Sequence, residues 1–229
     1  MFDYFKPIPK LDLPQIDSYE IEEKEEPMVS LAGLGFEVMS VYYARLLPGT
    51  TFDAYVRETV ARMLQKAQAL LPDGYRFMIL DAYRTVDVQK ALWEEYRSIV
   101  AMENPDASAE EIDRRTEFYV SRPSYDEMKP ALHNTGGAVD LTVMNDGGRV
   151  LDMGARFDDY RSTSATAYYE DSYNLIVKNN RRMLYNVMTE VGFTNHPSEW
   201  WHYDYGTKLW AYYTGKKPFY KGIPQYIPE

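Results

Sequence analysis

Cysteine is absent from the 229 residues, and histidine occurs only three times. The lack of cysteine excludes disulfide bonds, thiolate nucleophiles and cysteine-bound zinc, and it fits a reducing compartment. Basic residues are outnumbered, because 25 lysines and arginines face 35 acidic residues and the formal net charge is −10. A protein that binds nucleic acid through its phosphates needs a basic face, so this charge balance argues against that class of function.

Long hydrophobic runs are also missing. No window reaches about 18 consecutive apolar residues, so we expect no transmembrane helix and no membrane partner. The opening stretch MFDYFKPIPKLDLPQ contains Asp3, Lys6 and several prolines where a signal peptide needs an unbroken apolar segment. These features predict a soluble, cytoplasmic protein, and they leave its oligomeric state open.

The order of periodic segments predicts one α+β domain over residues 1–229, with a mainly antiparallel central sheet flanked by helices. Apolar residues have helical spacing over 50–71, about 86–100 and 172–191, and SAEE at 108–111 is a helix-capping signal. Strand composition is found over 36–47, 75–84 and 193–206, and residues 138–150 have a hairpin pattern around NDGG. We expect residues 1–35 to form an extended N-terminal arm and residues 211–229 a C-terminal tail.

The segment HNTGGAVDLTV places a histidine and an aspartate around a glycine pair. His133 lies in a loop-like stretch, and Asp140 follows seven residues later in a predicted strand. Because Gly136 and Gly137 allow the backbone to turn tightly, the two side chains can face one point. An ordinary loop histidine and a turn-capping aspartate would give the same pattern, so this segment alone does not identify a site.

A second polar pair occurs in the aromatic run SEWWHYDYG, which contains Glu199 and His202. Residues three apart on a flat strand point to opposite faces, so the pair converges only if the strand begins at a bend, which Pro197 allows. Two histidines and one carboxylate would make a three-ligand zinc site, with a second carboxylate as the base. Spacing does not decide which carboxylate has which role. His196 is a rival ligand, but we expect it to be solvated in its polar turn.

Two further motifs add polar residues at positions typical of sites. Arg84 follows an apolar strand in DAYRT and could stabilise a developing oxyanion. Asp158 lies in the irregular stretch MGARFD, where functional residues are common. Alone, the arginine would be interpreted as a surface ion-pair partner and the aspartate as a turn cap.

Taken in order, DAYR, HNTGGAVDLTV, MGARFD and SEWWHYDYG resemble the D-Ala-D-Ala dipeptidases of the M15 zinc peptidase family, the VanX type. The resemblance runs from about residue 36 to 210, and the combination of H-x6-D with E-x-x-H is fairly specific. It implies the small α+β fold shared by M15 peptidases and the Hedgehog N-terminal domain.

The resemblance also implies roles for individual residues. His133, Asp140 and His202 would hold one zinc ion per chain, which would be the only cofactor. Glu199 would be the general base, and Arg84 would stabilise the tetrahedral intermediate. The implied reaction is hydrolysis of D-alanyl-D-alanine, or similar small unblocked dipeptides, by a metal-activated water molecule.

Substrate contacts follow from the same resemblance. Asp158 matches a motif position near the free amine of the substrate, and Asp81 would support the site. One departure concerns the first ligand, where the family typically has S-x-H and this chain has Ala131, Leu132 and His133. The missing hydroxyl lies near the substrate carboxylate in the family, and Thr135 or backbone amides could replace it.

Two other functions remain to be tested. A D,D- or L,D-carboxypeptidase that trims peptidoglycan stem peptides would use the same chemistry, but it would normally need a secretion signal. A non-catalytic zinc-binding module of the same fold would need neither Glu199 nor Arg84, and both are present.

Overall fold

The computed structural model describes residues 2–16 and 18–227. Its main sheet has the strand order β2-β4-β5-β7-β6. The strands are β2 (Glu37–Val38), β4 (Arg76–Asp81), β5 (Ala138–Met144), β6 (Thr194–Asn195) and β7 (His202–Asp204). Only β2 and β4 pair in parallel, and the other three pairings are antiparallel. The predicted α+β class with a mainly antiparallel sheet is therefore confirmed.

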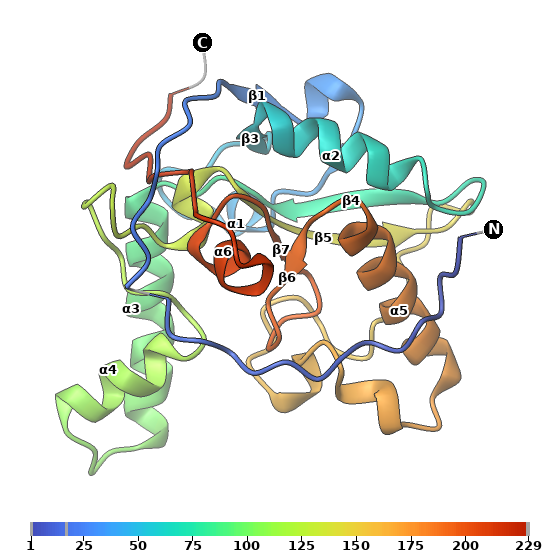
Figure 1. Cartoon of the computed structure of the whole chain (residues 1–229). Helices are drawn as coiled ribbons and strands as arrows, with labels where there is room; N and C mark the ends of the chain where they lie inside the picture. The colour runs from blue at the N-terminus through green and yellow to red at the C-terminus, as the bar shows by residue number, and fades with distance from the viewer. Residues whose placement is uncertain (1, 17, 228–229) are drawn as a thin grey trace.

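Helices flank this sheet (Figure 1). They are α1 (Val41–Ala44), α2 (Glu58–Gln68), α3 (Val86–Glu103), α4 (Ala109–Glu117), α5 (Leu175–Glu190) and α6 (Lys208–Thr214). Short 3-10 helices are η1 (Ala32–Leu34), η2 (Leu132–Thr135), η3 (Ser162–Ser164) and η4 (Tyr168–Asp171). The expected helix over 86–100 corresponds to α3, and Ser108 caps α4 by accepting a hydrogen bond from the Glu111 amide.

The central strand β5 is buried on both faces, and alternation along it separates the core from the site. Val139, Leu141 and Val143 belong to the main core, which also contains apolar residues of α2 and α5. Asp140 and Thr142 point to the opposite face. That face of the sheet is therefore the one that can present polar side chains to a substrate.

Two segments form other elements than those expected from the sequence. Residues 50–71 begin with the strand β3 (Tyr55–Arg57), which pairs with β1 (Met28–Ser30) of the N-terminal arm before α2 starts. Residues 36–47 form only the short β2 and then α1, because Tyr42 is buried against α3. In both segments the secondary structure depends on contacts with distant parts of the chain, which a local sequence pattern does not reveal.

The expected hairpin at 138–150 is also incomplete. After β5 the chain turns back, and its return pairs through the isolated bridge between Met144 and Val150 and a hydrogen bond from the Leu151 amide to the Val143 carbonyl at 2.9 Å. The strand β7 pairs only with residues 138–140 of β5, so this short return lies beside the other end of β5. The last predicted strand is split into β6 and β7 by residues 196–201, which we call the Glu199 loop.

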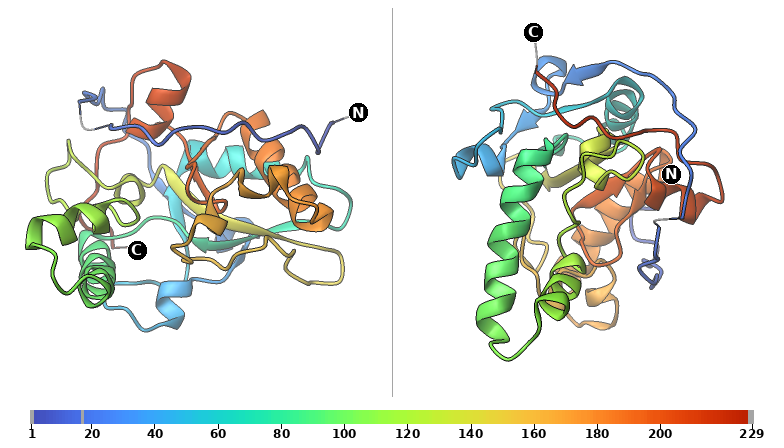
Figure 2. Two further views of the ribbon diagram at one scale, coloured as in Figure 1. Left: turned by 90° about the horizontal axis from the view of Figure 1, so that it is seen from below. Right: turned by 90° about the vertical axis from the view of Figure 1, so that its left-hand side faces the viewer.

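The N-terminal arm and the C-terminal tail both lie along the body of the protein (Figures 1 and 2). Asn186 of α5 donates hydrogen bonds to the carbonyls of Tyr4 and Lys6 in the arm. In the tail, Tyr220 is buried in the main core, and the amide of Ile223 donates to the Asn134 carbonyl in η2 at 2.7 Å. The tail therefore supports the turn that carries His133.

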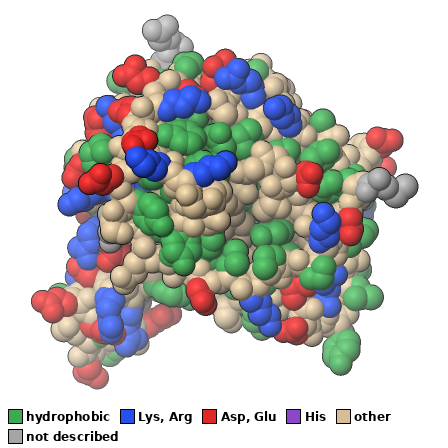
Figure 3. All heavy atoms as spheres, viewed as in Figure 1, with side chains coloured by type: hydrophobic (Ala, Val, Ile, Leu, Met, Phe, Trp, Pro, Cys, Tyr) green, Lys and Arg blue, Asp and Glu red, His purple; other side chains and the backbone are tan. Residues whose placement is uncertain are grey.

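Two surface observations bear on possible partners. Among the described residues, no helix is both long and apolar enough to cross a membrane. On the face seen in Figure 3, acidic and basic side chains are interspersed rather than gathered by sign.

Candidate metal centre and active site

The sheet register brings three polar residues into one row. Asp81 of β4 is paired with Asp140 of β5, and Asp140 is paired with His202 of β7. Cross-strand partners on one face of an antiparallel sheet have neighbouring side chains. Residues that are far apart in the sequence are thus adjacent at one end of the sheet, and all three are buried.

His133 joins this row from η2, the turn that precedes β5. Gly136 has φ +70°, a conformation that glycine adopts readily, and it lets the chain turn from η2 into the strand. The Nε2 atom of His133 lies 3.0 Å from Nδ1 of His202 and 3.4 Å from Oδ1 of Asp140. The distance from His202 Nδ1 to the same carboxylate oxygen is 3.0 Å. Three potential ligand atoms therefore surround one point.

Hydrogen bonds behind the two histidines fix which nitrogens face this point. His133 donates its Nδ1 proton to the carbonyl of Ala82 at 2.7 Å, and His202 donates its Nε2 proton to Asp204 at 2.9 Å. In the form that binds a metal, each ring is neutral and its inner nitrogen carries a lone pair. Such outer partners are typical of metal-binding histidines, because they orient the ring and raise its basicity.

These lone pairs make the cluster a fitting cation site. The inner nitrogens of His133 and His202 and the Asp140 carboxylate are three electron-rich groups, which is favourable only with positive charge between them. Asp140 Oδ1 is buried without a hydrogen-bond partner among the described residues. Nitrogen and oxygen ligands at about 2.0–2.1 Å from one ion in tetrahedral geometry lie about 3.3 Å apart, close to the spacings seen here. The donor set thus fits a zinc ion with one open position.

Glu199 lies beside the cluster rather than in it. The Glu199 loop turns tightly, because the amide of Glu199 donates to the His196 carbonyl at 3.0 Å. This turn is the bend that the sequence required, and it puts Glu199 Oε2 3.8 Å from His202 Nδ1. Burial raises the pKa of Glu199 to about 8. The side chain, only 15% exposed, is therefore a carboxyl group close to the ligand atoms without being one of them.

His196 was expected to be solvated, and that prediction is wrong. Its side chain is only 13% exposed, and its ring centroid lies 5.5 Å from that of His202. Burial lowers the pKa of His196 to about 3, so the ring is neutral. The reason is the tight turn of the Glu199 loop, which folds the ring inward. His196 is nevertheless outside the three-residue cluster.

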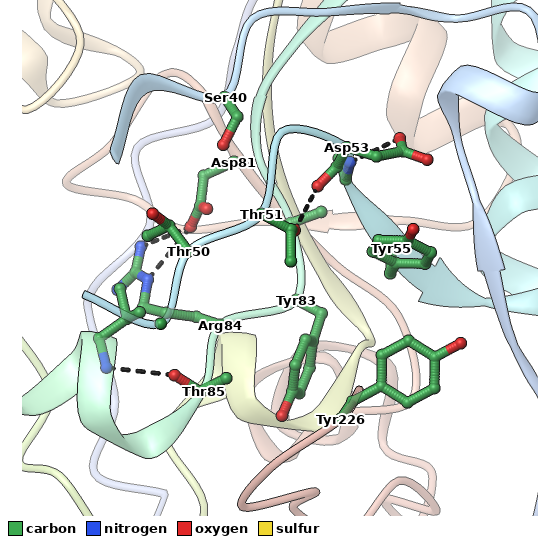
Figure 4. Close-up of a pocket in the computed structure, with 14 residues that line it drawn as sticks. Ser40, Thr50, Thr51, Asp53, Tyr55, Asp81, Tyr83, Arg84, Thr85 and Tyr226 are labelled. Atoms are coloured by element: carbon green, nitrogen blue, oxygen red, sulfur yellow. Dashed lines mark hydrogen bonds and ion pairs between the residues drawn. The ribbon is translucent and has the colours of Figure 1, made fainter. Parts of the chain in front are cut away.

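Arg84 is anchored just past the end of β4. Its Nε and Nη2 donate to Asp81 Oδ2 at 3.1 and 2.8 Å, and its Nη1 donates to Gln89 at 2.8 Å. The guanidinium also lies over the ring of Tyr42, with Nη2 3.9 Å from Asp140 Oδ2. Figure 4 shows Arg84 directed at Asp81 on the wall of a pocket that Tyr83 and Tyr226 also line. The arginine is thus a buried, oriented cation beside the ligand cluster.

Asp158 reaches the same region from residues 153–165, which we call the Asp158 loop. Its Oδ1 accepts a hydrogen bond from the Tyr42 hydroxyl at 3.1 Å. Its Oδ2 lies 3.8 Å from Nη1 of Arg45 but has no hydrogen-bond partner in the described part of the chain. Burial raises the pKa of Asp158 to about 7. Its φ is +58°, which is uncommon for a residue with a side chain. One carboxylate oxygen therefore remains available for a ligand.

Thr135 is held within its own turn. Its hydroxyl donates to the Leu132 carbonyl at 2.6 Å and accepts from the Gly137 amide at 2.9 Å. These bonds shape the turn that carries His133, and the contact of Thr135 with substrate stays a prediction.

Sequence reasoning missed two residues of this region. Asp204 supports His202, and the spacing of two along β7 could have identified it, because alternate strand residues share a face. Tyr42 bridges Asp158 and Arg84, accepting from the guanidinium at 3.4 Å. No local signal marks Tyr42, because only the packing of α1 brings it to the site.

Comparison with known proteins assigns the family. The family model described as D-Ala-D-Ala dipeptidase, of the M15 peptidases, matches residues 53–220. The D-alanyl-D-alanine dipeptidase of Synechocystis is 27% identical over 195 residues, covering 75% of this chain and 77% of its own length. That of Escherichia coli is 32% identical over 133 residues, covering 57% of this chain and 55% of its own.

A solved structure of a mutant of the vancomycin resistance D,D-pentapeptidase VanY, in complex with Zn(II), aligns over 89% of this chain and 97% of its own, with 16% identity and a TM-score of 0.45. The family match spans all four motifs, so the resemblance stated from them is confirmed. This chain therefore belongs to the D-Ala-D-Ala dipeptidase family of the M15 peptidases and is a peptidase.

Proposed function

We propose that this chain hydrolyses D-alanyl-D-alanine to two molecules of D-alanine with one zinc ion per chain. The observation that carries the proposal is the convergence of His133 Nε2, His202 Nδ1 and Asp140 Oδ1, with Glu199 Oε2 3.8 Å from one of these atoms. Family membership supports the substrate, since the curated relatives are named D-alanyl-D-alanine dipeptidases.

His133, Asp140 and His202 hold the metal in this proposal. Zinc suits two imidazoles and one carboxylate, and three protein ligands leave a position for water, as in catalytic rather than structural sites. When bound, the ion lowers the pKa of a water molecule and polarises the carbonyl of the scissile bond. The Ala82 carbonyl and Asp204 keep both rings in the tautomer that binding requires.

Glu199 is the general base. It takes a proton from the attacking water as the oxygen bonds to the peptide carbon, and it delivers that proton to the amine as the C–N bond breaks. Its Oε2 lies 3.8 Å from His202 Nδ1, so a water molecule placed to one side of this line can contact both the carboxylate and the ligand cluster. The enclosed position of this carboxyl group supports the role, because excluding bulk water strengthens the electrostatic interactions within a site.

Arg84 stabilises the negative charge that develops on the carbonyl oxygen. Asp81 and Gln89 hold its guanidinium from behind, so the cation needs little reorganisation during the reaction. Asp81 in this proposal acts through Arg84 rather than by contacting the substrate.

Asp158 binds the free amine of the dipeptide. Its Oδ2, which accepts no hydrogen bond from the described residues, and its burial support this role, because an ammonium group would donate the missing hydrogen bond. A site that pairs a buried carboxylate with an amine disfavours N-terminally extended peptides and blocked N-termini, which would leave this oxygen without its hydrogen bond. Together with the names of the curated relatives, this supports a small zwitterionic dipeptide as the substrate class.

A dipeptide panel on the zinc-loaded protein tests this function. We expect D-alanine release from D-Ala-D-Ala and far slower release from N-acetyl-D-Ala-D-Ala. Equal rates on both would favour a carboxypeptidase that acts on peptidoglycan stems. No release from any D- or L-dipeptide, with one zinc bound per chain, would instead indicate a zinc-binding module without turnover.

A further inference from the structure

A buried arginine outside the proposed catalytic set joins three backbone carbonyls. Arg181 of α5 is only 2% exposed. Its Nε donates to the carbonyl of Met153 at 2.7 Å, its Nη1 to that of Ala165 at 2.6 Å and its Nη2 to that of Thr163 at 2.7 Å. One planar guanidinium thus satisfies three carbonyls at once, which needs the fixed fork of arginine.

Arg181 is buried without an acidic partner. Among the ion pairs between described residues, none includes Arg181, and its only cation–aromatic contact is with Tyr169 at 4.7 Å. Burial lowers the pKa of Arg181 to about 10, which reflects the cost of keeping this cation away from water. The neighbouring Arg182, in contrast, is paired with Glu170. Because burying this cation is unfavourable, the three hydrogen bonds to carbonyls are the interactions that hold Arg181 in place.

The three carbonyls lie at the two ends of the Asp158 loop. Met153 precedes Asp158, while Thr163 and Ala165 follow it, so Arg181 ties both ends of the loop to α5. Within the loop, Asp158 has the uncommon φ of +58°, and such a conformation persists only where the surroundings enforce it.

The same end of the loop is bonded to the Glu199 loop. Trp200 donates its amide to the Ser164 carbonyl at 3.0 Å. Thr166 donates its amide to the Pro197 carbonyl at 2.9 Å and its hydroxyl to the His196 carbonyl at 3.1 Å. The residues that Arg181 holds therefore alternate with the residues that hold the Glu199 loop.

We propose that Arg181 is a positioning residue that sets the Asp158 loop, and through it the Glu199 loop, against the ligand cluster. This inference rests on the proposed function, because the roles of Asp158 and Glu199 belong to it. The metal ligands lie outside both loops, on η2, β5 and β7. Loss of Arg181 should consequently change substrate binding and turnover but not zinc content.

The test uses Arg181→Lys in the full-length zinc protein, with Arg182→Lys as the matched control on the same helix. Lysine keeps the charge but cannot bond three separated carbonyls, so we expect KM for D-Ala-D-Ala to rise about tenfold while zinc stays at one per chain. In an Asp158→Asn background the same change should raise KM by less than about twofold, because the two residues act through one loop. Arg182→Lys should leave KM unchanged.

A merely structural role predicts a different pattern. Lower thermal stability of Arg181→Lys with unchanged KM and kcat, or a full tenfold effect retained in the Asp158→Asn background, would overturn the proposal. Should Arg181→Lys not fold, Arg181→Gln, which removes the buried charge and keeps two donors, takes its place with the same expected outcomes.

Hydrogen exchange separates this inference from the proposed function. Amides of the Asp158 and Glu199 loops should exchange faster in Arg181→Lys than in the wild type and in Arg182→Lys, with β5 unchanged. Unaltered exchange in both loops would refute the positioning role whatever the substrate. Absence of D-Ala-D-Ala hydrolysis by the wild type, with faster exchange in the variant, would refute only the proposed function.

Discussion

Replacing Asp204 with asparagine should weaken the proposed zinc site without changing any of its three ligands. Asp204 is fully buried and accepts the Nε2 proton of His202 at 2.9 Å. Asparagine has nearly the same shape and can still accept this hydrogen bond, but it lacks the negative charge. The substitution should therefore weaken the support of the imidazole while leaving the fold intact.

The expected loss of zinc affinity follows from the weakened hydrogen bond between His202 and residue 204. A hydrogen bond to a charged group contributes about 1.5–3 kcal/mol, and loss of an outer partner of a metal-binding histidine typically costs about 10- to 100-fold in metal affinity. We expect the zinc Kd of Asp204→Asn to rise within that range. Competition with a chromophoric zinc chelator on metal-free protein measures this Kd.

The control is Asp53→Asn, which removes a charge of the same type. Asp53 accepts hydrogen bonds from the amides of Ala32 and Ala54 and does not contact His202. The zinc affinity of the Asp53→Asn protein should equal that of the wild type. An Asp204→Asn protein with a Kd within about twofold of the wild type would refute the idea that Asp204 orients a metal ligand.

Three further predictions concern activity and stability. Arg84→Lys should lower kcat about 100-fold at unchanged zinc content, because lysine cannot present the anchored fork to the developing oxyanion; near-normal steady-state kinetics would contradict this. Chelation should lower the melting temperature of the wild type, since zinc at about 1,000 times its Kd adds about 4 kcal/mol of stability, and scanning calorimetry of His133→Ala should show no response to chelator. Glu26→Gln should lower the free energy of unfolding by about 2 kcal/mol in urea titrations at pH 7, because Glu26 accepts hydrogen bonds from Thr59 at the start of α2. Burial alone would raise the pKa of Glu26, but hydrogen bonds from Lys24 and Thr59 lower it to about 2. The difference in unfolding free energy between the wild type and Glu26→Gln should therefore be present above about pH 4.5 and shrink as the pH falls toward 2. A difference that does not vary with pH would contradict the assignment.

The sequence was sufficient for the parts of the fold that local patterns determine. Helical spacing identified α3 and α5, and the capping signal at Ser108 is used as expected. Pairings between distant segments were not accessible in this way. The strand β3 was interpreted as helix, because its partner β1 lies in an arm whose sequence has no strand alternation.

The residues of the candidate site also differ in whether a local sequence pattern could identify them. The motifs contain His133, Asp140, Glu199 and His202, and the structure brings all four together through the register of β5 and β7 and the turn of the Glu199 loop. Tyr42 could not be found from the sequence, because it enters the site only through the packing of a short helix.

In the proposed mechanism, Glu199 is a base beside the metal rather than a ligand of it. The most direct measurement is D-alanine release from D-Ala-D-Ala by Glu199→Ala protein whose zinc content has been determined on the same sample. We predict one zinc per chain and no detectable release. Near-normal release at full zinc occupancy would contradict the base assignment, and loss of the zinc would show that Glu199 is itself needed to hold the metal.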